Sequence, residues 1–339
     1  MMKPTDFAYS LTNYLAKYLP HVSGLSTNTI LSYRDTFTSV IKFFYDMLGV
    51  KAEKITFELF NADHIIQYLD WLINSKVNSI STRNNRLAAI HAFAKYVIRH
   101  TPEAIYPMQE ILTIPMMKCT LAPPKFLSLE AMQLLLSLPD KNTNNGRRDC
   151  VMLSLLYDSG ARIQELCDII VSDIRLEKPP VIKLKGKGSK SRIVPLMPQM
   201  AELLRLYFYE HKLMGSASGY RPLFINHCGN KFTRKGVAYI LNKYFEIAKH
   251  LRPELFPNTI SPHSMRHSKS MHLLHSGVNL IYIRDILGHA DIKTTEIYAR
   301  IDTEMKRKAL EKASVGVISD GIPIWQSDKG LLEWLKSLG

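Results

Sequence analysis

The sequence predicts a mainly α-helical protein with one small β-sheet, divided between two domains. Apolar residues recur at helical spacing through residues 1–110, prolines interrupt residues 112–126, and residues 181–196 change to a strand–turn–strand pattern. A chain of 339 residues is long enough for two domains. We therefore expect a helical domain over residues 1–111, a linker over residues 112–126 and a second domain over residues 127–339.

Helices are predicted in order through the first domain. Ser26 suits the N-cap of a helix that Gly49 ends. A second helix is expected from about residue 61 to 73, and a third opens at Ser81 and Thr82. The first turns of this third helix also carry polar side chains able to reach phosphates or base edges, namely Arg83, Asn84, Asn85 and Arg86. A polar helix face in water is the alternative interpretation.

The linker and the second domain have their own signals. Pro115, Pro123 and Pro124 favour an extended linker. Glycines and lysines fill the turn between the two predicted strands. The predicted helices begin or lie at Ser128, 147–156, 233–249, 262–277, 281–287 and from about 292, and the predicted strands are 181–184 and 192–196.

The chain is basic, with a formal charge of +14 and a pI of about 9.5. The excess is uneven: residues 1–120 hold 12 Lys and Arg against 9 Asp and Glu, a net of +3, which leaves 14 − 3 = +11 for the remainder. Such a charge favours a polyanionic partner, foremost nucleic acid, bound most strongly by the second half. A solvated basic surface is the alternative.

The cysteines and the N-terminus indicate a compartment. Cys119, Cys150, Cys167 and Cys228 are widely spaced, which is typical of reduced thiols inside a cell. The N-terminal residues lack the apolar run of a signal peptide, and no apolar run approaches the length of a membrane span. We therefore expect a cytoplasmic protein that does not bind a membrane.

The densest cluster of chemically active residues runs from residue 263 to residue 298. His263, Arg266 and His267 share one predicted helix, His289 follows the next, and Tyr298 lies on another. An arginine grips two phosphate oxygens at once, imidazoles move protons near neutral pH, and a tyrosine oxygen can attack phosphorus. The pattern suits a scissile phosphate better than an apolar core.

Two earlier segments add cations to this cluster. Arg162 follows a glycine turn, and Glu165, three residues on, lies on the same helix face, where it can orient the guanidinium. The turn between the predicted strands carries Lys185, Lys187 and Lys190, all suited to reaching phosphate. An exposed helical ion pair and a solvated hairpin tip are the alternatives.

Taken together these motifs resemble the tyrosine recombinase (phage integrase, Xer-like) family over nearly the whole chain. The motifs are residues 159–166 (SGARIQEL), 186–192 (GKGSKSR), 263–267 (HSMRH), 287–289 (LGH) and 294–298 (TTEIY). Each is weak alone, whereas five in the right order and spacing are specific. The resemblance implies a helical, SAM-like core-binding domain followed by an α+β catalytic domain.

The resemblance also implies roles for individual residues. Arg162 and Arg266 would clamp the scissile phosphate, and Lys187 would protonate the leaving 5′ oxygen. His263 would assist proton transfer at the nucleophile, and His289 would hydrogen-bond a phosphate oxygen. Tyr298 would be the nucleophile, forming a 3′-phosphotyrosyl intermediate. Glu165 and His267 would support this site.

The implied partner is double-stranded DNA carrying specific recombination sites, bound by a tetramer of the protein. The expected DNA-contacting side chains come from both domains. They are Thr27, Thr29, Arg34, Ser81, Thr82, Arg83, Asn84, Asn85, Arg86, Lys185, Lys190, Arg192, Arg234 and Lys235. Exchange of the C-terminal tail between neighbouring subunits is a further implication.

No cofactor is expected. Two arginines supply the positive charge that a metal ion supplies in other phosphoryl-transfer sites, and the covalent linkage conserves the energy of the broken bond. A zinc site built on His263, His267, His272 and His275 is a rival interpretation, but it leaves Tyr298 unexplained. An inactive DNA-binding relative and a type IB topoisomerase are further rivals.

The biological purpose is open between integration, excision or transposition of a mobile element and Xer-like dimer resolution. Lys269 stands where the family usually has an apolar or aromatic residue, and is similar to what some transposon-encoded members carry. It favours a mobile element, and its amine can extend toward DNA. Tyr282, before the residue 287–289 motif, is assigned to packing.

Overall fold

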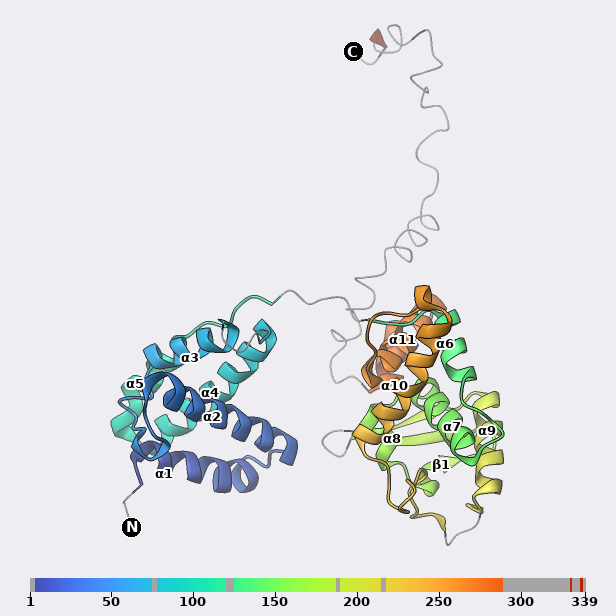
Figure 1. Ribbon diagram of the computed structural model, residues 1–339, viewed down its shortest axis with the longest axis horizontal. Helices are drawn as coiled ribbons and strands as arrows, with labels where there is room; N and C mark the ends of the chain where they lie inside the picture. Colours follow the sequence, from blue (N-terminus) through green and yellow to red (C-terminus); the bar gives the residue numbers. More distant parts are fainter. Residues whose placement is uncertain are drawn as a thin grey trace. The chain divides into compact units, whose positions relative to one another are not determined.

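The protein is described here by a computed structural model, which describes residues 4–74, 78–119, 125–186, 190–214 and 218–288, with 330, 336 and 337 (Figure 1). The chain divides into two compact units, Met1–Leu121 and Ala122–Gly339. Helices dominate both, and three short strands form one antiparallel sheet. The predicted fold class is confirmed.

The N-terminal unit is helical throughout its described residues. Its elements are α1 (Asp6–Asn13), the π-helix η1 (Tyr14–Val22), α2 (Thr27–Leu48), η2 (Ala52–Lys54), α3 (Ala62–Asn74), α4 (Ile80–His100), η3 (Pro102–Ala104) and α5 (Ile105–Thr113). As predicted, the Ser26 hydroxyl caps α2 by accepting from the backbone N–H of Thr29, and Gly49 ends it in the left-handed conformation at φ 65°. Helix α4 begins slightly earlier than predicted, because Ser79 is its cap.

Aromatic rings fill the core of this unit around Phe93 of α4. The Phe93 ring centroid lies 5.0 Å from that of Phe37 and 5.2 Å from that of Tyr14, and Phe7 and Phe60 are each 5.9 Å away. Such ring pairs add to the stability gained from burial alone. They fix the inner face of α4 and therefore which of its side chains face outward.

The C-terminal unit packs helices around the small sheet. Its helices are α6 (Leu129–Ser137), α7 (Asn144–Asp158), α8 (Ile163–Asp168), η4 (Val171–Asp173), α9 (Pro198–Glu210), α10 (Arg234–Leu251), η7 (Pro253–Leu255), α11 (Pro262–His275) and α12 (Leu280–Leu287). The strands are β1 (Ile174–Arg175), β2 (Val181–Lys185) and β3 (Ser191–Pro195), in the order β1-β2-β3. Strand β1 and helix α9 were not predicted from the sequence.

The predicted strand pair is confirmed and has one face in the core. Ile182 and Leu184 are buried, while Lys183 and Lys185 between and beyond them are exposed. This alternation follows from the two-residue period of a strand. Leu184 pairs with Arg192 across the hairpin, which places Arg192 at the end of the sheet nearest the turn.

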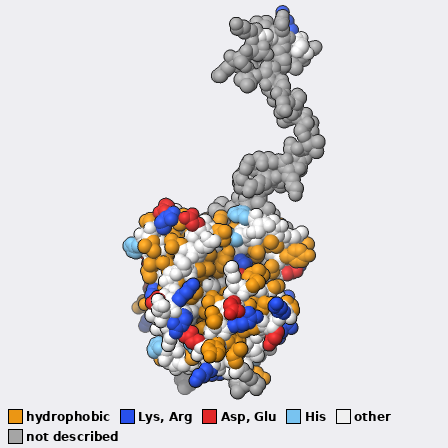
Figure 2. Space-filling view, turned by 90° about the vertical axis from the view of Figure 1, so that its right-hand side faces the viewer, with side chains coloured by type: hydrophobic (Ala, Val, Ile, Leu, Met, Phe, Trp, Pro, Cys, Tyr) orange, Lys and Arg blue, Asp and Glu red, His pale blue; other side chains and the backbone are white. Residues whose placement is uncertain are grey.

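Charge and hydropathy on the surface follow no simple division. Figure 2 shows one face, on which Lys and Arg side chains are interspersed with Asp, Glu and hydrophobic groups rather than gathered into one patch. No helix among the described residues is both long and apolar enough to cross a bilayer.

Candidate active site

Arg162 is positioned by a sharp turn between α7 and α8. Gly160 has a φ of 58°, and a Cβ on it would lie 2.7 Å from the Leu287 side chain. Ser159 stabilises the turn, donating to the Leu155 carbonyl at 2.6 Å and accepting from the Ala161 N–H at 3.3 Å. Only glycine fits both the conformation and the space at residue 160.

Glu165 holds Arg162 in place from the first turn of α8. Its Oε2 accepts from the Arg162 backbone N–H and its Oε1 from Arg162 Nη1, both at 2.8 Å. The Glu165 side chain is only 3% exposed, whereas that of Arg162 is 36% exposed. The buried Glu165 carboxylate thus fixes the Arg162 guanidinium on its inner side, while another part of the guanidinium faces solvent.

A second arginine, Arg192 of β3, contacts the same carboxylate. Its Nη1 and Nη2 donate to the two Glu165 oxygens at 3.0 and 2.8 Å, and its Nε donates to the Ile286 carbonyl at 2.7 Å. The side chain is 12% exposed. All three nitrogens are engaged inside the protein, whereas the sequence suggested a side chain that faces DNA.

Arg266 reaches the same place from α11. Pro262 begins this helix, as the sequence predicts, and Ser261 caps it. The Arg266 side chain is buried; Nη1 donates to the Gly160 carbonyl at 2.7 Å and Nη2 to the Leu287 carbonyl. Arg266 therefore ties the turn before Arg162 to the end of α12.

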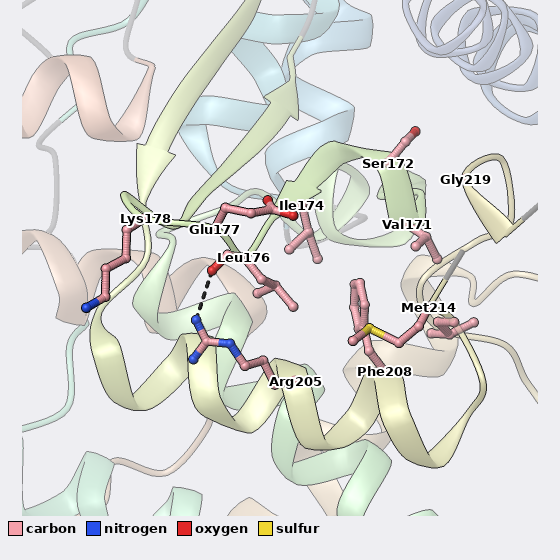
Figure 3. A pocket seen from close by; sticks show the side chains of 11 residues that line it. Val171, Ser172, Ile174, Leu176, Glu177, Lys178, Arg205, Phe208, Met214 and Gly219 are labelled. Carbon is pink, nitrogen blue, oxygen red and sulfur yellow. Dashed lines mark hydrogen bonds between the residues drawn. The ribbon is translucent and has the colours of Figure 1, made fainter. Parts of the chain in front are cut away.

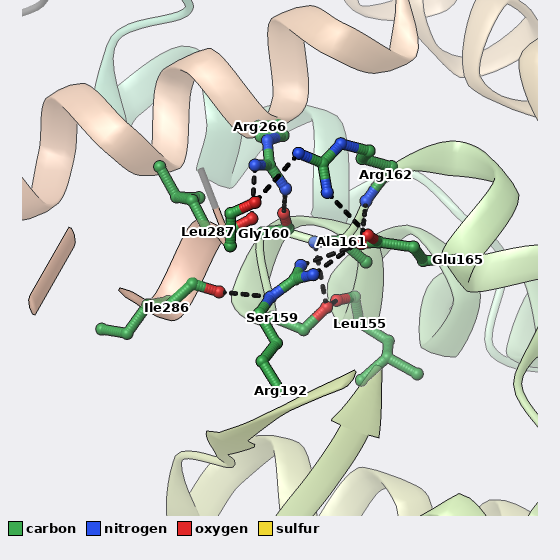
Figure 4. A network of polar contacts seen from close by, with 11 residues as sticks. Leu155, Ser159, Gly160, Ala161, Arg162, Glu165, Arg192, Arg266, Ile286 and Leu287 are labelled. Atoms are coloured by element: carbon green, nitrogen blue, oxygen red, sulfur yellow. Dashed lines mark hydrogen bonds and ion pairs between the residues drawn. The ribbon is translucent and has the colours of Figure 1, made fainter. Parts of the chain in front are cut away.

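The three arginines meet at three consecutive carbonyls, which we call the α12 terminus: the oxygens of Ile286, Leu287 and Gly288. Figure 4 shows the three arginines beside Ile286 and Leu287. Arg192 donates to the first and Arg266 to the second, and Arg162 donates to the third at 3.1 Å. The last carbonyls of a helix have no partner within it and carry partial negative charge. The guanidinium groups thus satisfy these three acceptors, and the terminus holds the three cations close together.

The cluster has a net positive charge. Three guanidinium groups and one carboxylate leave 3 − 1 = 2 positive charges among Arg162, Arg192, Arg266 and Glu165. Burial alone would raise the pKa of the Glu165 carboxyl. Hydrogen bonds from Arg192 and Arg162 outweigh burial and hold this pKa below its usual range, so the carboxylate stays charged. The arrangement is suited to binding a single phosphodiester anion.

His263 and His267 occupy the first turns of α11, with ring centroids 6.4 Å apart. The pKa of each is lowered, first by loss of water around the ring and then by repulsion of the protonated ring from nearby groups: Arg266 and Arg162 for His263, His263 and Arg266 for His267. A neutral imidazole at position 263 is able to accept a proton near pH 7.

Three predicted site residues, Lys187, His289 and Tyr298, lie outside the described residues, and so does the helix expected from about residue 292. The residues that flank them are described. The Gly186 N–H donates to the Lys190 carbonyl at 2.7 Å, and a Cβ on Gly186 would lie 3.3 Å from Glu165 Oε1. Gly288, in the α12 terminus, directly precedes His289. The chain therefore enters both segments from the arginine cluster.

The predicted DNA contacts of the C-terminal unit, other than Arg192, are exposed. Lys190, Arg234 and Lys235 face solvent, the last two in the first turn of α10. Lys185 is half-exposed and pairs with Asp173 at 3.1 Å. These cations remain accessible to a polyanion.

In the N-terminal unit only part of the predicted set faces outward. Thr27, Arg34, Ser81 and Asn85 are exposed, and Thr29 and Thr82 partly so. Arg86 is partly buried, and its Nη1 donates to the Thr36 hydroxyl at 3.3 Å.

Arg83 and Asn84 instead hold the chain that leaves this unit. Arg83 is buried and donates to the Pro115 carbonyl at 3.0 Å. The Asn84 amide donates to the Met117 carbonyl at 2.8 Å and accepts from the Met117 N–H at 3.1 Å. Their polar groups therefore serve the start of the connection between the units, a role that the sequence did not indicate.

The Lys269 side chain contacts Asp158 and Tyr157 of α7. Its amine pairs with Asp158 at 3.2 Å and lies 5.1 Å from the centre of the Tyr157 ring, and both ionic side chains are 15% exposed.

Tyr282 is exposed on α12, so its assignment to packing was wrong.

A separate hollow of about 650 Å³ lies beside β1 and α9 (Figure 3). Apolar side chains such as Ile174, Phe208 and Met214 line it, and Arg205 donates to the Leu176 carbonyl at 2.8 Å along its edge. None of its lining residues belongs to the arginine cluster.

Among the described residues, no group of three or more His, Cys, Asp or Glu side chains is placed to hold a metal ion.

Comparison with known families matches both units. The profile of the "Phage integrase family" matches residues 125–305, and that of the "Phage integrase, N-terminal SAM-like domain" matches residues 12–101. These matches cover the arginine cluster in the first case and the helical N-terminal unit in the second.

Known proteins are similar along the same length. A "putative integrase/recombinase y4rC" of Sinorhizobium fredii is 32% identical over 338 residues, 100% of both chains. "Tyrosine recombinase XerC" of Thermodesulfovibrio yellowstonii is 29% identical over 88% of this chain and 95% of its own. The Tn1549 transposon integrase, solved "in complex with transposon right end DNA", matches with a TM-score of 0.70 and 18% identity over 89% of this chain and 99% of that one, which shows a shared fold.

Proposed function

This chain belongs to the phage integrase family, and we propose that it recombines DNA at specific sites through Tyr298, in the service of a mobile element. As a tyrosine recombinase it is an enzyme that cleaves and rejoins DNA. The proposal adds the residues that carry out the reaction, the DNA that they act on and the purpose of the exchange.

The first step is an attack on phosphorus. The Tyr298 oxygen forms a bond to the phosphorus of a DNA strand, the bond from phosphorus to the 5′ oxygen breaks, and a 3′-phosphotyrosyl link results. The phenol proton passes to a base, for which His263 is the candidate. Lys187 gives a proton to the departing 5′ oxygen.

The second step reverses the first on a different strand. A 5′ hydroxyl from the partner duplex attacks the phosphotyrosyl link, restores a phosphodiester and releases the phenol. Two cleaved duplexes must be held together for this exchange, so we propose assembly as a tetramer on two recombination sites. The name of the XerC relative supports recombination, and the Tn1549 integrase, solved in complex with transposon right end DNA, shares the fold.

The observation that carries this proposal is the arginine cluster. Arg162 and Arg266 are fixed on neighbouring carbonyls of the α12 terminus, and the chain passes from there to His289 and Tyr298. Preorganised cations stabilise the charge that develops on the equatorial oxygens of a five-coordinate phosphorus. His289 would add a hydrogen bond to the same oxygens, with His267 in support.

A mobile element is the purpose we favour over dimer resolution. One relative that matches this chain from end to end carries the name "putative integrase/recombinase". Lys269 forms a partly buried ion pair with Asp158, at a position where the family usually has an apolar or aromatic residue. A genomic neighbourhood with a second recombinase gene and flanking repeats is expected; a location beside a chromosomal dimer-resolution site would favour the Xer-like role.

The nucleophile is tested with a Tyr298→Phe variant. Selection from random duplexes with this variant supplies the recognition site, because binding does not need the phenol. The unmodified protein is then expected to form a denaturation-resistant adduct with a nicked form of that duplex, and Tyr298→Phe none. Tyr282→Phe is the matched control and should form the adduct normally. An adduct with Tyr298→Phe would remove Tyr298 from the role.

The general acid is tested with a substrate whose leaving oxygen is replaced by sulfur. A 5′ thiolate departs without a proton, so this substrate should restore cleavage by Lys187→Ala to near the rate of the unmodified protein. Lys190→Ala, on the same turn, should change the cleavage rates of the oxygen and sulfur substrates by the same factor. Failure of the sulfur substrate to rescue Lys187→Ala would exclude Lys187 as the acid.

A further inference from the structure

Among the described cations of the hairpin, Arg192 is the least exposed and the most fully engaged. It lies on β3, close to the turn that carries Lys187, and its side chain points into the cluster (Figure 4). Its three nitrogens contact two different elements: Glu165 of α8 and the Ile286 carbonyl of α12. One side chain thus links the hairpin, α8 and the α12 terminus.

Glu165 depends on Arg192 as much as on Arg162. The carboxylate accepts four hydrogen bonds, two from each arginine. Among the described residues, the charged groups that face it are Arg162 from the start of α8 and Arg192 from β3. Removing Arg192 would leave a 3%-exposed carboxylate with half its donors, which favours its protonation.

The packing around Arg192 allows it little movement. A Cβ on Gly288 would lie 2.9 Å from Arg192 Cδ, and one on Gly186 would lie 3.3 Å from Glu165 Oε1. The backbone of the α12 terminus therefore packs against Arg192, and the backbone of the hairpin packs against Glu165. A shift of Arg192 would displace the α12 terminus and Glu165 together.

We propose that Arg192 is a positioning residue for DNA cleavage: through Glu165 it fixes the guanidinium of Arg162, and through Ile286 it fixes the α12 terminus beside the hairpin. The inference rests on the function proposed above. It places Arg192 outside the set of DNA contacts, since it acts on the phosphate only through Arg162.

The geometry requires arginine. A planar guanidinium presents Nη1 and Nη2 to the two carboxylate oxygens while Nε points to a third acceptor. A lysine at this position would keep the positive charge and one contact with Glu165, but it has no second group for the Ile286 carbonyl. Arg192→Lys should therefore recover only part of the function.

The test compares Arg192→Gln, Arg192→Lys and Arg175→Gln in the full chain. Arg175 lies on β1 of the same sheet and donates to the Pro179 carbonyl, so it is a matched loss of an arginine outside the cluster. On the selected duplex, Arg192→Gln should bind within about twofold of the unmodified protein but cleave on the order of 10- to 100-fold more slowly in a single turnover. Arg192→Lys should fall between, and Arg175→Gln should be unaffected.

Two further readouts separate positioning from a general loss of structure. In a Glu165→Gln background, Arg192→Gln should slow cleavage by much less, because the pathway through the carboxylate is already broken. In the single Arg192→Gln variant the cleavage rate should fall at acidic pH, where Glu165 becomes protonated. That acidic limb should vanish in the Glu165→Gln, Arg192→Gln double variant.

Several results would overturn the inference. Cleavage by Arg192→Gln at the full rate would do so, as would equal losses in both backgrounds or a weakened affinity that accounts for the whole defect. If Arg192→Gln does not fold, unimpaired cleavage by Arg192→Lys would overturn it. An unmodified protein that forms no adduct would refute the proposed function instead; carbon NMR of Glu165 would then still show whether Arg192→Lys raises the pKa of its carboxyl.

Discussion

At the scale of single residues, Gly288 is where the arginine cluster leaves no room for a side chain. Its φ is 63°, and a Cβ would meet Arg192 at 2.9 Å. Gly277, after α11, shares the conformation at φ 80° but has nothing within 4 Å of where a Cβ would lie. The two glycines differ only in crowding, so they form a natural comparison.

We predict that Gly288→Ala destabilises the protein more than Gly277→Ala. The left-handed conformation costs an alanine about 1–2 kcal/mol at either position, and at residue 288 Arg192 must also move. Urea denaturation of both variants measures the difference. Equal losses would mean that Arg192 yields at no cost, which would also weaken the case for its positioning role.

Contacts between single residues differ in how far the sequence predicts them. Arg162 and Glu165 are three apart on one helix, so their contact follows from helical geometry. Arg192 and Ile286 are 94 residues apart, and the acceptor is a backbone carbonyl that any amino acid supplies. Nothing in the composition of residues 286–288 marks them as partners of arginines.

At the scale of elements, α11 carries a histidine that the fold keeps neutral. His272 Nε2 donates to the Leu127 carbonyl at 3.0 Å, so Nδ1 is the acceptor for the Tyr157 hydroxyl at 2.8 Å. Burial lowers the pKa of His272, and repulsion from the nearby His275 and Lys269 lowers it further. The hydrogen bond to the Leu127 carbonyl raises this pKa but does not offset the other effects. His267 on the same helix is lowered in the same way.

We predict that the free energy of unfolding decreases as the pH falls from about 7 to about 5. Unfolded histidines bind protons below about pH 6.5, whereas His272 and His267 in the folded protein resist protonation. The unfolded state then binds more protons, and stability is lost until the lowered pKa is reached. Urea titrations at several pH values measure this slope, which His272→Gln should reduce. A pH-independent free energy would contradict the prediction.

Elements differ in how well the sequence reveals them. Capped amphipathic helices such as α2, α6 and α10 were predicted near their bounds, because Ser26, Ser128 and Thr233 mark their starts. Strand β1 has only two residues, too short for an alternating pattern. The roles of Arg83 and Asn84 were missed because their partners, Pro115 and Met117, lie more than thirty residues away.

At the scale of the whole molecule, the net positive charge is divided unevenly along the chain. Of the +14 net charge, +11 belongs to residues 121–339. Several exposed cations of the C-terminal unit, including Lys190, are predicted to contact DNA, whereas Lys54 in η2 is exposed but belongs to no such set. The two lysines allow the electrostatic contribution to be counted.

We predict that binding to the selected duplex weakens steeply as salt is added, and that Lys190→Gln makes this dependence shallower. Loss of one phosphate contact lowers the slope of log K against log salt by about 1. Lys54→Gln should leave the slope unchanged. Fluorescence anisotropy at several salt concentrations measures all three slopes, and a flat response of the unmodified protein would contradict binding along the DNA backbone.

The α12 terminus has a consequence for how this protein can vary. Its three acceptors are main-chain atoms, so replacing the side chains of residues 286 and 287 with others of similar volume would keep every arginine contact. Adding or deleting a single residue within α12 would instead rotate the helix end by about 100° and present the wrong carbonyls to the guanidinium groups. Over evolutionary time this helix should therefore drift in composition while its length stays fixed.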